Sequence, residues 1–532
     1  MNRRLLNLSV CVAFLVCVFV LSAARSFAQQ NEGGPEIVNE MHHDTSLPVR
    51  FLAAQGVHPA NRMVAPLHRR PGPPLIGSAA EQSAAEQMIR PFAMPRVATT
   101  NLMNLDGVSD RDGVAPPDTN ASVGATQVVE VVNESYQVFN KSTGTSVLGP
   151  AEISSIWSGF GGTCGNALNN FSDPVVVYDK AANRWLVTVL GSADGFLSGV
   201  ECVAVSSTSD ATGSYHRYSF GFGAGKLNDY PKFGVWPDAY YASYNMFSPT
   251  AFLGAKVCAY NRAHMLAGLS ANAHCFQRST NDFSFLPSDM DGTSLASAGE
   301  PNFFVELFTT TTLHLFKFHV NFTTPSLTTF TGPTTITVNS FTIACAATGT
   351  CIPQSGTGTK LDSLSDRLMF RLAYRNLGTH EALVAAHSVK PTSGPVSAVR
   401  WYEIRSPSAT PTVFQQGTFS LASQAAWMPS IGMDKVGDIA VGFSQSSSTT
   451  HPGIAYTGRI PTDPAGMMET AHTLFTGAGS QNGGLTRWGD YTSISIDPVD
   501  DCTFWYANEY IPSNGNFNWH TRLASFKFTA CH

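Results

Sequence analysis

The chain has 532 residues, of which 13% are charged and 43% are hydrophobic, and its formal net charge is −6. Basic residues are not gathered into a patch anywhere in the sequence, which argues against nucleic-acid binding. Thr, Ser, Gly, Phe and Val are abundant, whereas Lys and Glu are scarce, a balance typical of strands and turns. A chain of this length exceeds one hydrophobic core, so we expect repeated units or several domains.

The first 28 residues have the composition of a secretory signal peptide. The basic start Met1–Arg4 precedes an apolar run from Leu5 to Leu21, and Ser26-Phe27-Ala28 forms a small-x-small cleavage site. A retained membrane anchor is the alternative, because the apolar run is marginally long enough to span a bilayer. The polar residues after Ala28 favour cleavage. We therefore expect a secreted protein, extracellular or periplasmic, without membrane attachment after cleavage.

Residues 29–100 differ in composition from the remainder. They include the turn-rich stretch His68–Pro74 and lack the alternation of strands, which predicts a loosely ordered leader or pro-segment.

Residues 101–532 are predicted to form the main domain. In this part a unit recurs, in which an apolar stretch, a short polar turn and a second apolar stretch follow one another. The units begin near residues 128, 173, 229, 302, 367, 428 and 490.

This spacing, mostly about 60 residues, predicts an all-β fold, a single β-propeller of about seven blades. One blade cannot bury both of its faces alone, so the units must stack around an axis. The stretch Ser525–Phe528 is predicted to be the final strand. A pair of β-sandwiches with accidental periodicity is the alternative.

Eight cysteines remain after removal of the signal peptide. An even number in an exported chain predicts disulfides, and none of these residues has the spacing of a zinc site. Sequence does not decide the connectivity. We favour pairing between neighbours along the chain, which gives Cys164–Cys202, Cys258–Cys275, Cys345–Cys351 and Cys502–Cys531.

Several local motifs resemble those of a family of large, secreted bacterial proteins that are mostly uncharacterised or likened to sialidase-type β-propellers. These motifs are Ala115–Asn120, Leu361–Met369, Arg487–Tyr491 and Asp500–Tyr506. The resemblance extends from about Gly113 to Cys531 and implies the fold and export, but no activity. The Ser-x-Asp-x-Gly-x-Thr-Trp box of sialidases is not present, since Ser288–Thr293 has the wrong spacing.

An acidic residue recurs where the first strand of a unit begins, at Asp173, Asp229, Asp366 and Asp490, and Asp118 holds a similar place. In a propeller, equivalent positions surround the axis, so these carboxylates are predicted to converge at one mouth of the channel. Carboxylates that lie close together repel one another, which raises some of their pKa values and lets one act as an acid beside an ionised partner. Glycoside hydrolysis requires such a pair. Structural hydrogen bonding at the blade junctions is the alternative, and recurrence in nearly every unit favours it.

The candidate acid/base residues are Asp229, Asp366 and Asp490. Candidate clamps for an acidic sugar are Arg367, Arg375 and Arg487, because guanidinium groups pair with carboxylates. Candidate aromatic platforms for sugar rings are Tyr230, Trp488 and Tyr491.

Calcium is the one metal that the sequence indicates, and no other cofactor is expected. Asp289, Asp291 and Glu300 occupy the first, third and twelfth places of an EF-hand-like loop, although Gly292 is not at the sixth place. Solvated turns explain such residues equally well.

From these features we expect a secreted protein that binds or cleaves an extracellular glycan at the acidic mouth of its channel. Any enzymatic activity would be that of a glycoside hydrolase or a polysaccharide lyase. The alternative is a non-catalytic extracellular scaffold or adhesion protein that binds a surface protein. In either case we expect a monomer that does not bind nucleic acid.

Overall fold

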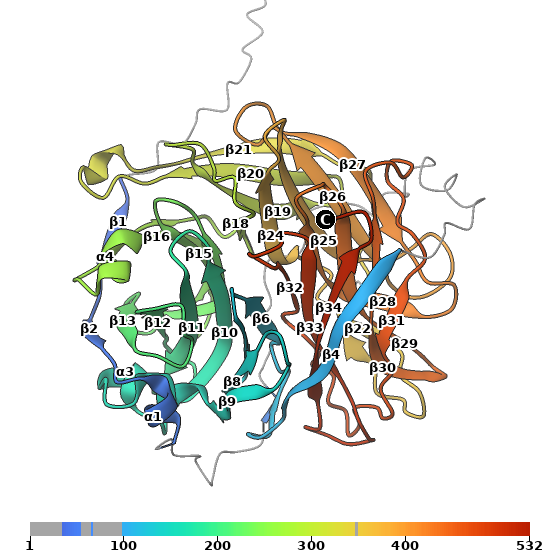
Figure 1. Cartoon of the computed structure of the whole chain (residues 1–532), viewed down its shortest axis with the longest axis horizontal. Helices are drawn as coiled ribbons and strands as arrows, with labels where there is room; N and C mark the ends of the chain where they lie inside the picture. Colours follow the sequence, from blue (N-terminus) through green and yellow to red (C-terminus); the bar gives the residue numbers. More distant parts are fainter. Residues whose placement is uncertain (1–33, 55–64, 67–97, 346–348) are drawn as a thin grey trace, which may run out of the picture. The chain divides into compact units, whose positions relative to one another are not determined.

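The computed structural model describes residues 34–54, 65–66, 98–345 and 349–532, and strands dominate these ranges (Figure 1). The predicted signal peptide and most of residues 29–100 lie outside the described residues. In the described ranges, none of the helices combines the length and the apolar character that a membrane crossing requires.

Most described strands belong to groups of four antiparallel strands, in which strands that are consecutive in the chain pair with each other. We call these groups blades and number them along the chain. Blades 1 to 3 are formed by β6 (Asn120–Val123), β7 (Gln127–Val132), β8 (Ser135–Asn140) and β9 (Ser146–Glu152); by β10 (Asn170–Asp179), β11 (Arg184–Ser192), β12 (Val200–Ser206) and β13 (Tyr215–Gly221); and by β14 (Leu227–Val235), β15 (Tyr240–Phe247), β16 (Phe252–Tyr260) and β17 (Asn272–Gln277).

The remaining blades follow the same order. Blades 4 to 6 are formed by β18 (Leu286–Asp291), β19 (Asn302–Thr309), β20 (Thr312–His319) and β21 (Thr329–Thr337); by β24 (Met369–Asn376), β25 (Glu381–Val389), β26 (Ala398–Arg405) and β27 (Thr412–Phe419); and by β28 (Ala425–Met433), β29 (Ile439–Ser447), β30 (Thr450–Arg459) and β31 (His472–Phe475). Blade 7 contains β32 (Ser493–Ile496), β33 (Thr503–Tyr510), β34 (His520–Phe528) and β4 (Thr99–Ser109).

The first strands of the blades form a closed ring. Each contacts the next in the order β6, β10, β14, β18, β24, β28 and β32, and β32 contacts β6 again. Strands β18 and β24 also pair with each other in parallel, from Ser288↔Leu372 to Asp291↔Arg375. This ring of strands around an axis is a β-propeller, so the predicted fold class is confirmed.

The last blade is completed by a strand from near the start of the described chain. Strand β4 pairs antiparallel with β34, from Thr99↔Phe528 to Ser109↔His520, and lies in light blue beside the dark red β33 and β34 in Figure 1. The sequence analysis missed this strand. The pairing joins the two ends of the ring by backbone hydrogen bonds and covers the outer edge of β34.

Part of the predicted leader is ordered against blades 2 and 3. Strand β1 (Glu36–Asn39) pairs with β17, and β2 (His42–Thr45) pairs with β13. Helix α1 (Val49–Ala53) follows and buries Val49 and Leu52. Residues 36–53 therefore add a fifth strand to each of two blades, while the predicted domain boundary near residue 100 stays a prediction.

Short elements connect or flank the blades. They are β3 (Ala65–Pro66), β5 (Val114–Ala115), η1 (Ile153–Trp157), α3 (Gly162–Gly165), α4 (Arg262–Ala267), η2 (Pro325–Leu327), β22 (Thr350–Ile352) and β23 (Leu361–Asp362).

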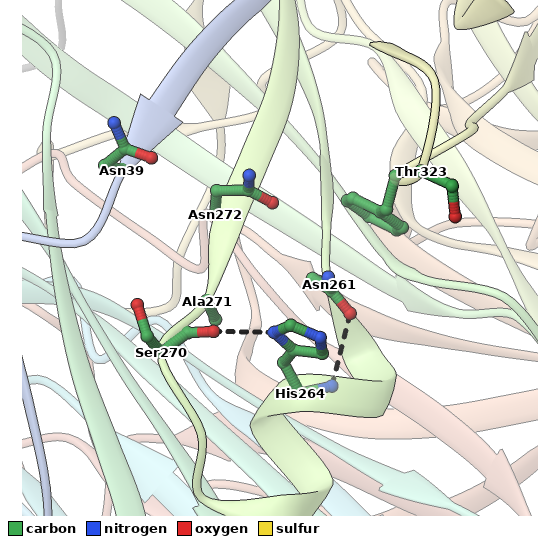
Figure 2. Close-up of a pocket in the computed structure, with 8 residues that line it drawn as sticks. Asn39, Asn261, His264, Ser270, Ala271, Asn272 and Thr323 are labelled. Atoms are coloured by element: carbon green, nitrogen blue, oxygen red, sulfur yellow. Dashed lines mark hydrogen bonds between the residues drawn. The ribbon is translucent and has the colours of Figure 1, made fainter.

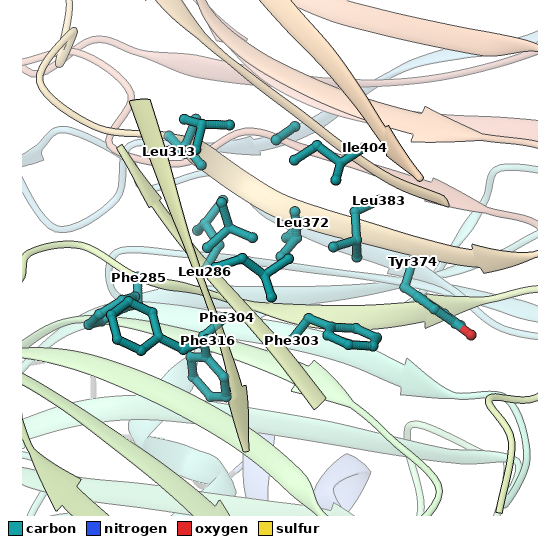
Figure 3. Close-up of a cluster of buried hydrophobic side chains, with 14 of the residues drawn as sticks. Phe285, Leu286, Phe303, Phe304, Leu313, Phe316, Leu372, Tyr374, Leu383 and Ile404 are labelled. Carbon is teal, nitrogen blue, oxygen red and sulfur yellow. The ribbon is translucent and has the colours of Figure 1, made fainter. Parts of the chain in front are cut away.

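Apolar side chains pack between the faces of neighbouring blades. Figure 3 shows one such core, in which Phe303 of blade 4 lies beside Tyr374 of blade 5, with 6.1 Å between the ring centroids. The ring of Trp236, which follows β14 of blade 3, lies 4.7 Å from that of Tyr374. Each large apolar side chain buried in this way stabilises the fold by about 1.5–3 kcal/mol.

All four predicted disulfides are confirmed, namely Cys164–Cys202, Cys258–Cys275, Cys345–Cys351 and Cys502–Cys531. Cys258 and Cys275 are register partners on the adjacent strands β16 and β17, and Cys502 lies just before β33 of the last blade. Neighbour pairing holds because each blade is built from consecutive strands. The four disulfides are consistent with an extracellular protein.

Candidate functional site

The entry of the inner strand has the same unusual backbone in six blades. A non-glycine residue there has a positive φ between 48° and 61°, and these residues are Asp118, Asp173, Tyr230, Ser284, Met428 and Asp490. In blades 2, 3 and 6 the residue lies in an interruption of the strand ladder, between Ser172/Val175, Asp229/Lys232 and Trp427/Ser430. A left-handed residue other than glycine costs about 1–2 kcal/mol. The recurrence therefore indicates a constrained corner that directs side chains to one end of the axis.

Three of these corners hold aspartates, from the adjacent blades 7, 1 and 2. Asp490, Asp118 and Asp173 influence one another electrostatically, and all three act on the ammonium group of Lys232 from blade 3. We call these four residues, together with Tyr230, the axial cluster. The sequence analysis placed Asp118 beside the candidate acids but did not identify Lys232.

Lys232 is enclosed by aromatic rings. It is completely buried, and its Nζ lies 3.1 Å from the ring centroid of Tyr230 and 3.3 Å from that of Tyr491. The Tyr491 hydroxyl lies 3.0 Å from Asp173 Oδ2 and 2.8 Å from the carbonyl oxygen of Pro231. Burial lowers the pKa of Lys232 well below its usual value, although the charge of Asp173 opposes this shift.

The buried aspartates favour their protonated forms. Burial raises the pKa of Asp118 well above its usual value, and the charges of Asp173 and Asp490 act in the same direction. Burial also raises the pKa of Asp173, against the hydrogen bond from Ser172 Oγ at 2.6 Å and the charge of Lys232. For Asp118, Asp173 and Lys232 alike, burial favours the uncharged form.

Two arginines bring the predicted acids Asp366 and Asp490 to the edge of this cluster. Arg487 lies 2.6 Å from Asp490 Oδ2, and Arg367 lies 2.8 Å from Asp366 Oδ1. Burial on its own would lower the pKa of the Arg367 guanidinium. The negative charges of Asp366 and Asp490 have the larger effect, so this pKa is raised. The guanidinium of Arg367 also lies 4.6 Å from the ring centroid of Tyr230.

Further contacts fix these arginines and the tyrosine. Arg487 reaches Asp362 at 3.4 Å, a residue that the sequence analysis did not single out. The Tyr230 hydroxyl donates to the carbonyl oxygen of Asp490 at 3.3 Å. Burial raises the pKa of this hydroxyl.

Two buried carboxylate oxygens of the axial cluster have unused hydrogen-bonding capacity. Asp118 Oδ1 and Asp490 Oδ1 have no hydrogen-bond partner among the described residues. The side chain of Asp490 is 12% exposed and that of Asp366 is 21% exposed. A buried acceptor without a donor costs about 1–3 kcal/mol, so a ligand that brings hydroxyl groups would be favoured at this place.

The third candidate acid, Asp229, is turned toward its own strand. It is partly exposed, and its Oδ1 accepts a hydrogen bond from the backbone N–H of Tyr230 at 3.0 Å. Asp229 thus supports the corner at Tyr230, as the structural alternative of the sequence analysis expected for such residues.

Four candidate binding residues are placed where they cannot take the predicted roles. Arg375 binds both oxygens of Asp501, at 2.8 and 2.9 Å, near the far end of β24. Trp488 is completely buried, and its Nε1 donates to Ser444 Oγ at 3.1 Å. Tyr491 is also completely buried and Tyr230 is 4% exposed, so neither ring offers a face to a sugar.

The predicted calcium ligands are engaged by other charged side chains. Asp289 and Asp291 lie on β18 and pair with Arg371, at 2.7 and 2.5 Å, and Asp291 also pairs with Lys180. Glu300 instead interacts electrostatically with Glu381 and Lys317. The arrangement provides arginine and lysine partners where calcium was expected, so it does not support this site.

In the part of the chain that the structure describes, Asp434, Cys502 and Cys531 bring three potential metal-ligand atoms together. The two cysteines form a disulfide, which removes their thiolates as ligands.

Comparisons with known proteins give structural likenesses only. No family model matches the chain, and no curated protein matches it. The chain is similar to the solved structure "Structure of Dos1 propeller", with 8% identity, a TM-score of 0.37, and coverage of 81% of this chain and 95% of that one. It is also similar to "Hadza microbial sialidase Hz136", with 10% identity, a TM-score of 0.34, and coverage of 77% and 74%.

A third similar structure is a polysaccharide lyase of family PL25, an ulvan lyase, with 10% identity, a TM-score of 0.36, and coverage of 80% of this chain and 96% of that one. At these identities and TM-scores, none of the three likenesses bears on activity.

Proposed function

We propose that this protein is a secreted enzyme that binds an extracellular glycan at the axial cluster and hydrolyses it. The observation that carries the proposal is the pair of buried, unpartnered oxygens of Asp118 and Asp490 at the mouth of the ring. Sugar hydroxyls are neutral donors in high density, and they match such acceptors better than an anion or an apolar ligand does.

The partly exposed carboxylates Asp366 and Asp490 are the reacting pair in this proposal. Both act electrostatically on Tyr230 and Arg367, which places them around the same two side chains. Glycoside hydrolysis uses one carboxyl group to protonate the leaving oxygen and one carboxylate to activate water or attack the sugar. Ion pairs hold both carboxyl groups in place, from Arg487 to Asp490 at 2.6 Å and from Arg367 to Asp366 at 2.8 Å.

The buried Asp118 and Asp173 serve as support in this proposal. Burial raises the pKa of both carboxyl groups, which limits the negative charge next to Asp490. Arg367 and Arg487 are the cations next to the reacting pair, and their ion pairs hold it in place.

The proposal is tested by measuring release of reducing ends from a panel of neutral and acidic polysaccharides. We expect the native protein to act on at least one of them. Asp490→Asn and Asp366→Asn should each lower turnover by about 100-fold or more, the usual range for loss of a general acid or base. Unfolding curves should stay close to that of the native protein, because Asn keeps the shape of each side chain.

Asp106→Asn is the matched control, because its carboxylate on β4 is 63% exposed and lies in the outer strand of blade 7. Its turnover should equal that of the native protein. Unchanged turnover in Asp490→Asn would remove this residue from the chemistry. Glycan binding without turnover on any substrate would favour the non-catalytic scaffold instead.

A further inference from the structure

A polar pocket lies at the outer side of blade 3, where the N-terminal strand β1 meets the propeller. Its volume is about 220 Å³. Strand β1 contributes Asn39, β17 contributes Asn272, and the start of α4 contributes Asn261 and His264. Figure 2 shows these side chains around the opening, with Thr323 on the side opposite to Asn272.

The side chains of this pocket are held in place by the surrounding structure. Asn39 and Asn272 are register partners of the antiparallel pair β1–β17. Asn261 caps helix α4, and its Oδ1 accepts from the backbone N–H of His264 at 3.2 Å. The Nδ1 of His264 lies 2.7 Å from the carbonyl oxygen of Ser270, so in the neutral ring Nδ1 carries the proton and Nε2 is an acceptor.

One buried acceptor of the pocket has no donor. Asn272 Oδ1 is shielded from solvent and has no hydrogen-bond partner within the described ranges. The amide groups of Asn39, Asn261 and Asn272 each combine a donor and an acceptor on one side chain. Two adjacent hydroxyls of a sugar ring require this combination, because each hydroxyl both donates and accepts.

The lining also contains one apolar surface. Phe322 contributes its ring to the pocket, and the ring of His274 lies 4.9 Å from it. An aromatic ring beside amide groups suits a ligand with one C–H face and polar edges, as a pyranose has.

The composition of the lining excludes other ligand classes. None of the described residues that line it is Asp, Glu, Lys or Arg, so it offers neither a cation for phosphate or carboxylate nor carboxylates for a metal. Its volume lies below the range of about 300–1,000 Å³ usual for drug-sized ligands, which fits one sugar ring and not a large cofactor.

We infer that this pocket binds one neutral sugar unit of a glycan, separately from the axial cluster. The inference rests on the proposed function for the ligand class and adds a second point of attachment for the same polymer. Two points of attachment on one chain raise the effective concentration of the glycan at the axial mouth. The pocket is completed by Asn39, so it also gives the ordered segment 36–53 a role in binding.

The inference is tested with full-length protein in the Asp490→Asn background, which weakens the axial site. Saturation-transfer NMR is recorded with neutral trisaccharides of glucose, galactose and mannose, and with a galacturonate trisaccharide as the charged comparison. We expect signals from at least one neutral trisaccharide, and a decrease of five-fold or more in Asn272→Ala and in Phe322→Ala. The matched controls Asn281→Ala and Leu327→Ala, at exposed positions nearby, should keep the signal.

The two proposals fail in distinguishable ways. Equal signals in the two pocket variants and their controls would overturn the pocket, as would a signal limited to galacturonate. Turnover that survives Asp490→Asn while the pocket variants lose binding would overturn the axial proposal and leave the pocket standing. Unfolding curves of Asn272→Ala and Phe322→Ala check that loss of signal does not reflect loss of fold, and Asn39→Ala on the exposed β1 provides a third variant.

Discussion

Two groups of buried charged residues differ in how completely their hydrogen-bonding capacity is used. In one group, Arg371 lies between Asp289 and Asp291, its Nη1 donates to the carbonyl oxygen of Ile494 at 3.1 Å, and Lys180 reaches Asp291. In the axial cluster, Asp118 and Asp490 keep carboxylate oxygens without a partner in the described part of the chain. The first group is saturated and holds blades together. The second is unsaturated, and the proposed function places a ligand there.

The same contrast is visible in the protonation of the two groups. The charge of Arg371 outweighs the burial of Asp291 and lowers the pKa of its carboxyl group to about 2. Burial raises the pKa of Asp118 well above its usual value. Residue type therefore does not separate a structural acid from a functional one, whereas its partners do.

The largest expected effect is on the saturated group. Arg371→Met should lower the free energy of unfolding by about 3–5 kcal/mol, because it leaves the buried Asp289 and Asp291 without their main partner. Chemical denaturation measures this loss. Arg522→Met is the control, since its partner Asp106 is 63% exposed and such surface pairs contribute under about 1 kcal/mol. Similar losses in both variants would contradict the distinction.

The next effect concerns the pH dependence of stability. With its raised pKa, Asp118 favours the folded state most below pH 3.8, and this stability is lost as pH rises through the folded pKa. Asp118→Asn mimics the protonated form at all pH values. Its stability relative to the native protein should therefore increase above pH 3.8, by about 1.4 kcal/mol for each unit by which the pKa is raised.

Asp291→Asn should show the opposite sign when the free energy of unfolding of both variants is measured by urea denaturation over a range of pH. The lowered pKa of Asp291 adds stability that is present above pH 3.8 and lost as pH falls through about 2. The variant should therefore be less stable than the native protein at neutral pH and approach it in strong acid. If both variants changed in the same direction, the two groups would not differ as described.

The smallest expected effect comes from the hydroxyl that supports the axial cluster. Tyr491→Phe removes the donor 3.0 Å from Asp173 Oδ2 and should cost about 1 kcal/mol of unfolding free energy. The aromatic ring against Lys232 is kept, so the fold should be unaffected. Tyr510→Phe, which removes a hydroxyl 2.8 Å from the exposed Asp106, should cost less. An equal loss of unfolding free energy in both variants would show that the hydroxyl bound to Asp173 contributes no more than one bound to an exposed carboxylate.

The repeated units and the disulfides could be predicted because they follow from patterns that are local in the sequence. Each blade is a run of consecutive strands, so turn signals and cysteine neighbours describe it directly. Strand β4 was not predicted because its partner β34 lies more than 400 residues later. Its sequence Thr99–Ser109 is largely exposed on the outer edge and lacks a strong apolar pattern.

The axial cluster was predictable only in part. Recurrence of an acid at strand entries indicated Asp490, Asp366 and Asp118, because equivalent positions meet around an axis. Lys232 was missed, because the role of a charged residue inside an apolar strand can be inferred only when its neighbours in space are known.

The roles given to Arg375 and Trp488 failed for the same reason. Both are near predicted acids in the sequence, but Arg375 lies at the opposite end of its strand and Trp488 packs against Trp427. The alternation of apolar and polar residues along a strand does not reveal which residue will form the ion pair or hydrogen bonds of a buried charged side chain.

The central claim is that the axial cluster has spare hydrogen-bond acceptors that a glycan fills. A crystal structure of the protein soaked with an oligosaccharide cleaved from the best substrate of the panel tests it most directly. The account predicts a sugar hydroxyl within hydrogen-bonding distance of Asp490 Oδ1, beside Asp366 and Arg487. A mouth without sugar, or Asp490 Oδ1 bonded to a protein donor in the crystal, would contradict the account.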